Sequence, residues 1–139
     1  MLDIRENSLD ADTYLYLRRE VGWPLLTKHQ AECALNNCLF NVCAYLDGKP
    51  VGMGRIVGDG AVISYVQDLV VIPTAQGMHI GSEILDRLRQ YVEDITEPGS
   101  RMMLCLMCAK GRESFYEHHG FIARPTDNLG PGMISYINK

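Results

Sequence analysis

The sequence lacks an apolar run that could cross a membrane. No uninterrupted apolar stretch approaches the ~20 residues that a bilayer-spanning helix requires. Its first residues, MLDIRENSLDAD, have neither the basic start nor the apolar segment of an export signal. We therefore expect a cytoplasmic protein with no membrane partner.

Positive charge is also in short supply. The chain has 13 Lys and Arg against 17 Asp and Glu, which gives a formal net charge of -4. A protein that binds nucleic acid needs a basic patch to attract the phosphate backbone. The charge balance therefore argues against nucleic acid as a partner.

The chain has no linker rich in Pro, Gly or Ser, and no internal repeat. Its 139 residues are the length of one ordinary domain, and 47% hydrophobic with 22% charged residues is typical of a globular chain. We therefore expect a single domain over residues 1–139.

The number of cysteines is odd, whereas small proteins held together by disulfides usually have an even number. Of the five cysteines, Cys105 and Cys108 have the two-residue gap of redox and zinc motifs, but they lie in the apolar run MMLCLMC. That run is typical of a buried strand, in which positions three apart point to opposite faces. We expect reduced core thiols and no metal site.

The order of apolar and turn residues predicts a mixed α/β chain. Thr27 lies three residues before Gln30, which is a capping-box pattern at the start of a helix. Asp47 and Gly48 separate two β-rich runs and predict an antiparallel hairpin. The expected strands are residues 1–5, 39–46, 51–57, 61–72, 101–108, 121–124 and 133–137, and the expected helices are residues 10–21, 27–36, 80–92 and 112–119.

The most informative segment, residues 72–82, joins the long strand to the most amphipathic helix. Gly77 and Gly81 allow bare backbone N–H groups to gather at a helix N-terminus, where the helix dipole favours an anion. The three-glycine spacing of the dinucleotide fingerprint is absent. The segment is a candidate anion cradle, and the alternative is an ordinary tight loop.

Two motifs resemble signatures of the GNAT superfamily of N-acetyltransferases. The first is Gln/Arg-x-x-Gly-x-Gly/Ala after a long strand. Gln76 and Gly81 match its first and last positions, whereas His79 stands at the middle glycine. The second motif, Phe-Tyr-Glu-x-x-Gly-Phe, is intact at residues 115–121. The element order also agrees, so the resemblance covers nearly the whole chain.

The resemblance implies an α/β (α+β) fold, with a mostly antiparallel central sheet of about six to seven strands flanked by about four helices. It also implies direct transfer of an acetyl group from acetyl-CoA to a primary amine in a ternary complex. In the family, loop N–H groups hold the pyrophosphate and the end of the long strand pairs with the pantetheine arm. The cofactor-binding residues carried over are Leu69, Val70, Val71, Gln76, Gly77, Met78, His79, Ile80, Gly81 and Ser82.

The histidine at the glycine position has two opposing effects. A left-handed backbone is less favourable for His79 than for glycine, which would weaken cofactor binding. Its imidazole could also donate a hydrogen bond to a pyrophosphate. We expect the loop to bind acetyl-CoA still.

Acetyl transfer requires a neutral amine and a proton for the departing thiolate. Free alkylamines have a pKa near ~10.4, so a base or a water chain must take a proton before attack. Asp68 is the nearest acidic candidate, and a structural carboxylate is an equal alternative. The resemblance also implies that a backbone N–H near Leu69 or Val70 would meet the oxyanion. The resemblance gives the thiolate's proton to Tyr116, whose alternative role is that of a core tyrosine.

The acceptor is expected near the early helices, where Trp23, Tyr14 and Arg55 are the candidate residues. Trp23 is an equally good core residue. The negative net charge is compatible with a cationic acceptor such as a small amine, an aminoglycoside or a lysine side chain. Two other classes compete: a regulatory domain that binds acetyl-CoA without turnover, and a structural module. Exposed C-terminal strands could pair between chains and form a homodimer.

Overall fold

The computed structural model describes residues 1–139, which form two compact units. The first unit is Met1–Leu104 and the second is Cys105–Lys139. Each unit is described here by itself.

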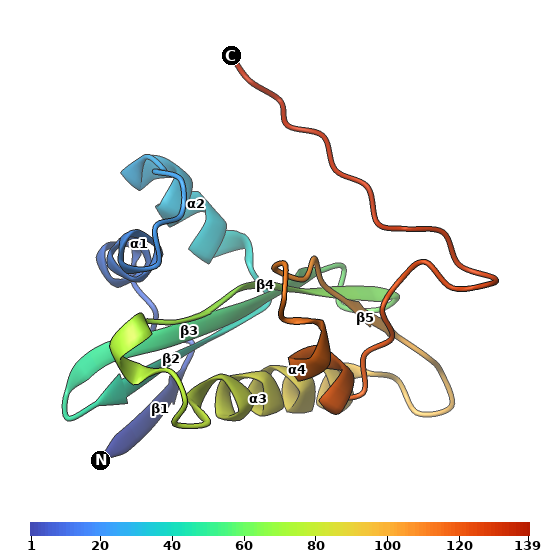
Figure 1. The fold of residues 1–139 in the computed structure, drawn as a ribbon, viewed down its shortest axis with the longest axis horizontal. Coiled ribbons are helices and arrows are strands. Elements are labelled where there is room, and N and C mark those ends of the chain that lie inside the picture. The colour runs from blue at the N-terminus through green and yellow to red at the C-terminus, as the bar shows by residue number, and fades with distance from the viewer. The chain divides into compact units, whose positions relative to one another are not determined.

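The first unit contains a sheet and three α-helices (Figure 1). The strands are β1 (Leu2–Glu6), β2 (Phe40–Leu46), β3 (Lys49–Gly58), β4 (Ile63–Val71) and β5 (Met103–Cys105), of which the last residue, Cys105, begins the second unit. The helices are α1 (Ala11–Glu20), α2 (Lys28–Asn37) and α3 (Ile80–Ile95), with a 3₁₀ turn at Pro73–Ala75.

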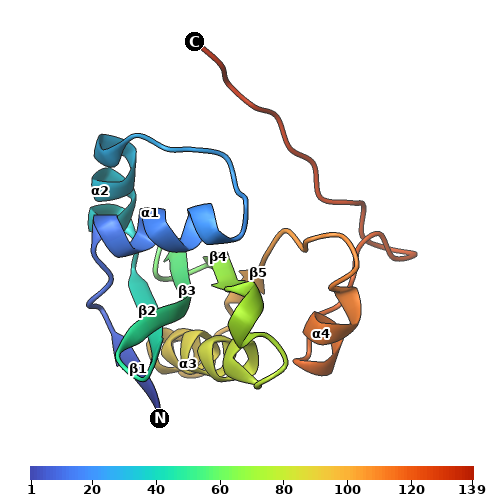
Figure 2. The ribbon, with the colours of Figure 1, turned by 60° about the vertical axis from the view of Figure 1, so that its left-hand side comes forward.

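The sheet has the order β1-β2-β3-β4-β5, and the pairs from β1 to β4 are antiparallel. Helices α1 and α2 lie on one face of the sheet and α3 lies on the other (Figures 1 and 2). The predicted mixed α/β class is confirmed. No helix is both long enough and apolar enough to cross a membrane.

Local signals start both early helices, and the sequence predicted the one that starts the second. Asp10 caps α1, since its carboxylate accepts a hydrogen bond from the Thr13 N–H at 2.8 Å. Thr27 and Gln30 form the predicted capping box of α2, in which each side chain bonds the other residue's backbone N–H. The caps satisfy N–H groups that a helix leaves without internal acceptors.

Helix α3 packs closely on the sheet because its apolar residues recur on one face. Its buried residues are Ile80, Ile84, Leu85, Leu88 and Val92. Gly54 of β3 allows this close approach, because a Cβ at that position would lie 2.8 Å from Leu88 Cδ1 and 3.0 Å from Ile84 Cγ2. The glycine therefore sets the distance between the helix and the strand.

The second unit contains the short helix α4 (Glu113–His118), and two expected strands are absent from it. The predictions of strands at residues 121–124 and 133–137 were wrong, and residues 101–108 supply only the three-residue β5. The sheet thus has five strands instead of six to seven. Ile122 is 75% exposed and Ile137 is 84% exposed, so neither segment buries the apolar face that stabilises a strand. Pro125 and Pro131 lie between the two segments, and neither has the backbone N–H that a strand uses for pairing.

We predict that Gly54→Val lowers the free energy of unfolding by roughly 2 kcal/mol, because the added carbons must displace α3 from β3. Urea unfolding measures this. The matched control is Gly130→Val, because a Cβ at Gly130 meets no atom within 4 Å. Equal stability losses in the two variants would contradict the proposed close approach.

Candidate active site

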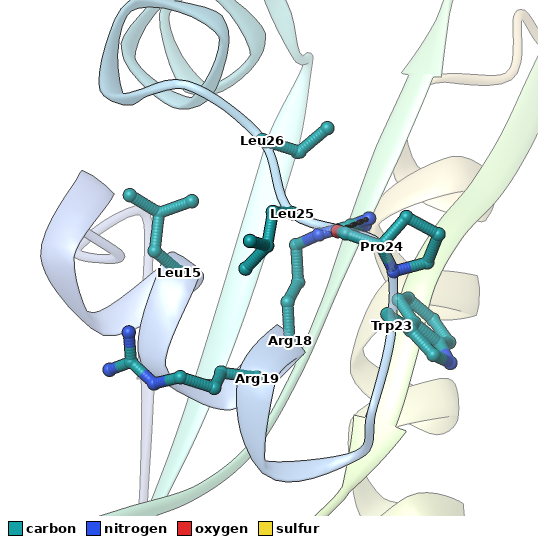
Figure 3. Close-up of a pocket in the computed structure, with 7 residues that line it drawn as sticks. All are labelled: Leu15, Arg18, Arg19, Trp23, Pro24, Leu25 and Leu26. Atoms are coloured by element: carbon teal, nitrogen blue, oxygen red, sulfur yellow. Dashed lines mark hydrogen bonds between the residues drawn. The ribbon is translucent and has the colours of Figure 1, made fainter.

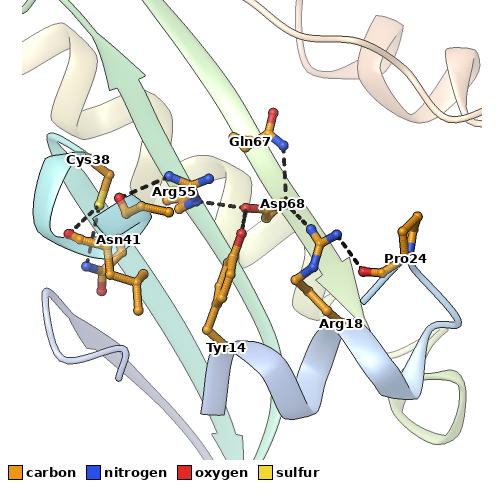
Figure 4. Close-up of polar contacts among 10 residues, drawn as sticks. Tyr14, Arg18, Pro24, Cys38, Asn41, Arg55, Gln67 and Asp68 are labelled. Carbon is orange, nitrogen blue, oxygen red and sulfur yellow. Dashed lines mark hydrogen bonds and ion pairs between the residues drawn. The ribbon is translucent and has the colours of Figure 1, made fainter. Parts of the chain in front are cut away.

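Strand β4 carries a bulge at Asp68. Arg55 of β3 pairs with Gln67 and Met53 pairs with Val70, so the single residue between them on β3 faces two residues on β4. Asp68 has a φ of +57°, in the left-handed region. A bulge of this kind bends a strand and redirects a side chain. Here it directs the Asp68 carboxylate to the face that α1 covers (Figure 4).

Four side chains donate hydrogen bonds to the Asp68 carboxylate (Figure 4). Oδ2 accepts from Tyr14 Oη at 2.6 Å and from Arg55 Nε at 2.7 Å. Oδ1 accepts from Arg18 Nη1 at 3.0 Å and from Gln67 Nε2 at 3.3 Å. We call these five residues the Asp68 cluster. Each carboxylate oxygen thus has two donors, which fills its usual acceptor capacity.

The cluster is buried. The Asp68 side chain is 0% exposed, that of Arg18 is 12% exposed and that of Arg55 is 10% exposed. Burial and then the hydrogen bond to Asp68 raise the pKa of Tyr14. Burial lowers the pKa of Arg55, but the hydrogen bond and the charge of Asp68 outweigh it and raise that pKa overall. Both shifts keep the protons on the donors of the cluster.

The cluster also holds the early helices on the sheet. Arg18 comes from α1 and donates through Nη2 to the Pro24 carbonyl in the loop after that helix, at 3.1 Å. Arg55 comes from β3 and donates through Nη1 to the Ala34 carbonyl of α2, at 3.3 Å. One carboxylate therefore fixes α1, α2 and the loop between them against β3 and β4.

The end of β4 lies beyond the reach of its outer neighbour. Met103 N donates to Val62 O at 3.0 Å, just before β4 begins, and β5 has only three residues. The segment Leu69–Val71 lies well past that point. No residue of β5 extends this far, although Val71 O already accepts from Gln76 Nε2. A ligand with its own amides could pair with the rest of this edge.

The start of α3 offers backbone N–H groups. Its cap is His79, with φ 61° and ψ 16°, and this residue makes no side-chain capping bond. The first turn of a helix has no internal acceptors for its N–H groups, and its dipole attracts anions. Gly77 has a φ of +80° and open space at its Cβ position. Gln76 holds the loop to the strand end, because its Nε2 donates to Val71 O at 3.0 Å.

The proposed acceptor residues lie in different surroundings. Tyr14 is 1% exposed and Arg55 is 8% exposed, so both are internal members of the Asp68 cluster and not part of an accessible surface. Trp23 is half-buried and lies beside Arg18, whose Cζ is 5.2 Å from the ring centroid (Figure 3). The sequence reasoning missed Arg18. Its signal was the four-residue spacing from Tyr14, which places both on one helix face.

Tyr116 belongs to the second unit. It is half-buried on α4, with its ring edge-on to Phe115 at 5.0 Å and to Phe121 at 5.8 Å between centroids. Gly120 follows the helix with a φ of +88°, the conformation that commonly ends helices. The Phe-Tyr-Glu-x-x-Gly-Phe motif is thus a capped helical turn whose aromatic rings pack together.

The family comparison covers both motifs. A family model described as an acetyltransferase (GNAT) domain matches residues 36–123. The chain belongs to the GNAT acetyltransferase family. Membership implies acyltransferase activity, and the matched range includes the bulged β4, the start of α3 and α4.

Two solved structures are similar to this GNAT protein. One is a protein of unknown function from meticillin-resistant Staphylococcus aureus, titled "Probable Acetyltransferase", with 28% identity, a TM-score of 0.85 and 100% coverage of both chains. The other is a GNAT-family acetyltransferase of Streptococcus pneumoniae TIGR4, with 29% identity, a TM-score of 0.82 and coverage of 100% of this chain and 99% of that chain.

A curated relative shares part of its length with the GNAT chain. Serotonin N-acetyltransferase 2, chloroplastic, from Oryza sativa subsp. japonica is 32% identical over 92 residues. The match covers 66% of this chain and 43% of the rice protein. The GNAT chain therefore matches less than half of that relative.

We predict that Tyr14→Phe lowers the free energy of unfolding at pH 7 by about 1.5–3 kcal/mol, because it removes a buried hydrogen bond to a charged group. The pKa of Tyr14 is raised in the folded chain. The stability that its hydroxyl contributes is therefore complete below about pH 10, the pKa in the unfolded chain, and is lost as the pH rises through the pKa in the folded chain. Urea unfolding between pH 8 and 11 should show a shallower alkaline decline in the variant.

The control for that measurement is Tyr136→Phe, because Tyr136 is 79% exposed. It should keep both the stability and the alkaline decline of the unchanged protein. Identical alkaline slopes in Tyr14→Phe and the unchanged protein would contradict the role of the buried hydroxyl.

We predict that His79→Gly raises the free energy of unfolding by about 0.5–1 kcal/mol. A left-handed side chain costs about 1–2 kcal/mol, and the greater entropy of an unfolded glycine offsets part of the gain. Thermal unfolding measures the change. Gln76→Gly is the control, since Gln76 has a φ of -70° with no strain to relieve, and it should lose stability. A loss in both variants would contradict strain at His79.

Proposed function

We propose that this GNAT protein is an N-acetyltransferase that moves an acetyl group from acetyl-CoA to a primary amine by direct attack in a ternary complex. The observation that carries the proposal is the combination of a strand end at Leu69–Val71 that β5 does not reach with an α3 start that has no side-chain cap. Pantetheine amides suit the first feature and a diphosphate suits the second.

The residues fit the donor. The N–H groups of the loop and first turn would hold the diphosphate, and Gly77 leaves the open space that a phosphate needs. The binding residues in this proposal are Leu69, Val70, Val71, Gln76, Gly77, Met78, His79, Ile80, Gly81 and Ser82. Acetyl-CoA supplies the activated acetyl thioester.

The proposed acetyl transfer involves one amine, one thioester and the phenol of Tyr116. The neutral amine nitrogen forms a bond to the acetyl carbon, the carbon–sulfur bond breaks, and sulfur takes the electron pair. The Tyr116 hydroxyl gives its proton to sulfur, and water carries the surplus proton from nitrogen and restores the phenol. A phenol of pKa ~10 is a weaker acid than a thiol of pKa ~8.5, so this transfer depends on positioning.

Asp68 acts in this proposal as a positioning residue and not as the base. Its two oxygens already accept four hydrogen bonds, two of them from arginines. Removing that carboxylate's charge would leave buried guanidinium groups without a counterion. A water chain therefore takes the amine's proton. Asp68 holds the bulge, so that the backbone N–H of Leu69 can meet the oxyanion.

The acceptor contacts Trp23 directly, whereas Tyr14 and Arg55 act through the Asp68 cluster. The rice relative's name specifies serotonin, an aromatic alkylamine, and the exposed part of Trp23 offers a ring for such a partner to contact. A cytoplasmic location and a homodimer belong to the same proposal. Exposed apolar residues at the C-terminal end support self-association: Met133, Ile134 and Ile137.

We predict release of free thiol when the protein is incubated with acetyl-CoA and a library of primary amines. Tyr116→Phe should lower kcat by roughly 10²–10⁴-fold, because a positioned general acid contributes that much. The binding affinity for acetyl-CoA should stay unchanged in calorimetry. Tyr136→Phe is the matched control and should keep full turnover.

Each outcome separates the candidate functions. Saturable binding of acetyl-CoA without thiol release for any amine would favour the regulatory domain. No binding at millimolar acetyl-CoA would refute both the enzyme and the sensor and leave the structural module. Full turnover of a folded Tyr116→Phe at every pH would refute the role of the phenol.

A further inference from the structure

Strand β1 forms one edge of the sheet in the first unit. It is the first strand in the order β1-β2-β3-β4-β5, and it pairs only with β2. Ile4 is half-buried and the other residues of the strand are exposed. An exposed edge strand is a template for pairing with another strand, and proteins often block such an edge with proline or a bulge. β1 has no proline, and its register with β2 is continuous.

The backbone groups at the open edge of β1 belong to every second residue. Asn7 N donates to Asn41 O at 2.8 Å, and Asp47 N donates to Met1 O at 3.1 Å. In an antiparallel ladder, residues that exchange such bonds alternate with residues that do not. The odd-numbered residues of β1 therefore bond to β2. The residues whose backbone N–H and C=O groups point to the open edge are Leu2, Ile4 and Glu6.

Side-chain charge favours one register for the pairing of β1 with β1 of a second copy. Three two-fold antiparallel registers pair at least two of the outward residues, and they are centred on Asp3, Ile4 or Arg5. In the first and third registers, two aspartates or two arginines lie directly opposite each other. In the register centred on Ile4, each Asp3 lies opposite Arg5 of the other copy. Opposite charges across a strand pair are favourable and like charges are unfavourable.

The register centred on Ile4 also uses the whole edge. It pairs Leu2 with Glu6 at both ends and Ile4 with its own copy, and each of these pairs can exchange two hydrogen bonds. Asp3 and Arg5 then form the intervening pairs without backbone bonds, whose side chains are closest because the Cα atoms are only about 4.5 Å apart. The two Ile4 side chains meet on the face that α3 covers, since Glu6 on that face accepts from Arg87 of α3 at 3.0 Å.

The charged pair of β1 is already oriented for this contact. Arg5 donates through Nε to Asp3 Oδ2 at 2.7 Å, and its Cζ is 4.0 Å from the ring centroid of Tyr45 on β2. The two side chains therefore lie on one face of the strand and are about half exposed, at 50% and 54%. The bond through Nε leaves the Nη groups of Arg5 for a carboxylate of the other copy.

We propose that β1 binds β1 of a second copy of this chain, antiparallel and centred on Ile4, so that the sheets of the two copies become continuous across a two-fold axis. Each copy contributes the same strand, as a two-fold interface requires. This interface differs from self-association through the C-terminal residues, and it does not depend on acetyl transfer.

The test reverses one charge at a time. Sedimentation velocity over a series of protein concentrations measures the dissociation constant of the dimer. Asp3→Arg and Arg5→Asp should each weaken the dimer about tenfold or more, because like charges then lie opposite each other. An equimolar mixture of the two variants should restore the dimer, because the positive positions of one variant lie opposite the negative positions of the other.

The matched control is Arg101→Asp, since Arg101 is exposed and lies outside the strands. It should form dimers as the unchanged protein does. Far-UV circular dichroism of each variant checks that the fold is kept, which both exposed positions of β1 should allow.

Three results would overturn the β1 interface. The first is a protein that stays monomeric up to roughly 1 mM, the range of very weak affinity. The second is a dimer that both single variants keep at full strength; its loss in Ile134→Ser would then place the contact at the C-terminal residues. The third is a mixture of the variants that forms no dimer. Each of these results leaves the acetyltransferase proposal standing, because thiol release tests that proposal separately.

Discussion

The first unit depends on one buried carboxylate. Asp68 lies on a strand, and its four donors come from α1, β3 and the neighbouring position of its own strand. The same two arginines reach the backbone of α2 and of the loop after α1. A carboxylate and two guanidinium groups tolerate burial only while they remain paired. The interaction therefore fixes where the early helices and the loop between them lie on the sheet.

Residues 68–79 have an unusual backbone conformation at each end, at the Asp68 bulge and at the start of α3. Asp68 and His79 both adopt a positive φ, at 57° and 61°. Non-glycine residues rarely do so, and local strain of this kind persists where surrounding contacts hold it. At Asp68 the four hydrogen bonds supply that hold. His79 has no side-chain capping bond that could do the same.

Local signals predicted the elements that local contacts decide. The capping box at Thr27 and the hairpin turn at Asp47 and Gly48 depend on neighbours in sequence, and both predictions are confirmed. The expected strands at residues 121–124 and 133–137 failed because a strand needs a partner edge and a buried face, which no local pattern guarantees. The bulge was equally invisible, since the residues around Asp68 have the composition of an unbroken strand. Asp68 was a candidate from its place on the strand, but its partner Arg18 was not. The four-residue spacing places Arg18 on the same helix face as Tyr14, but only the tertiary structure shows that this face meets Asp68.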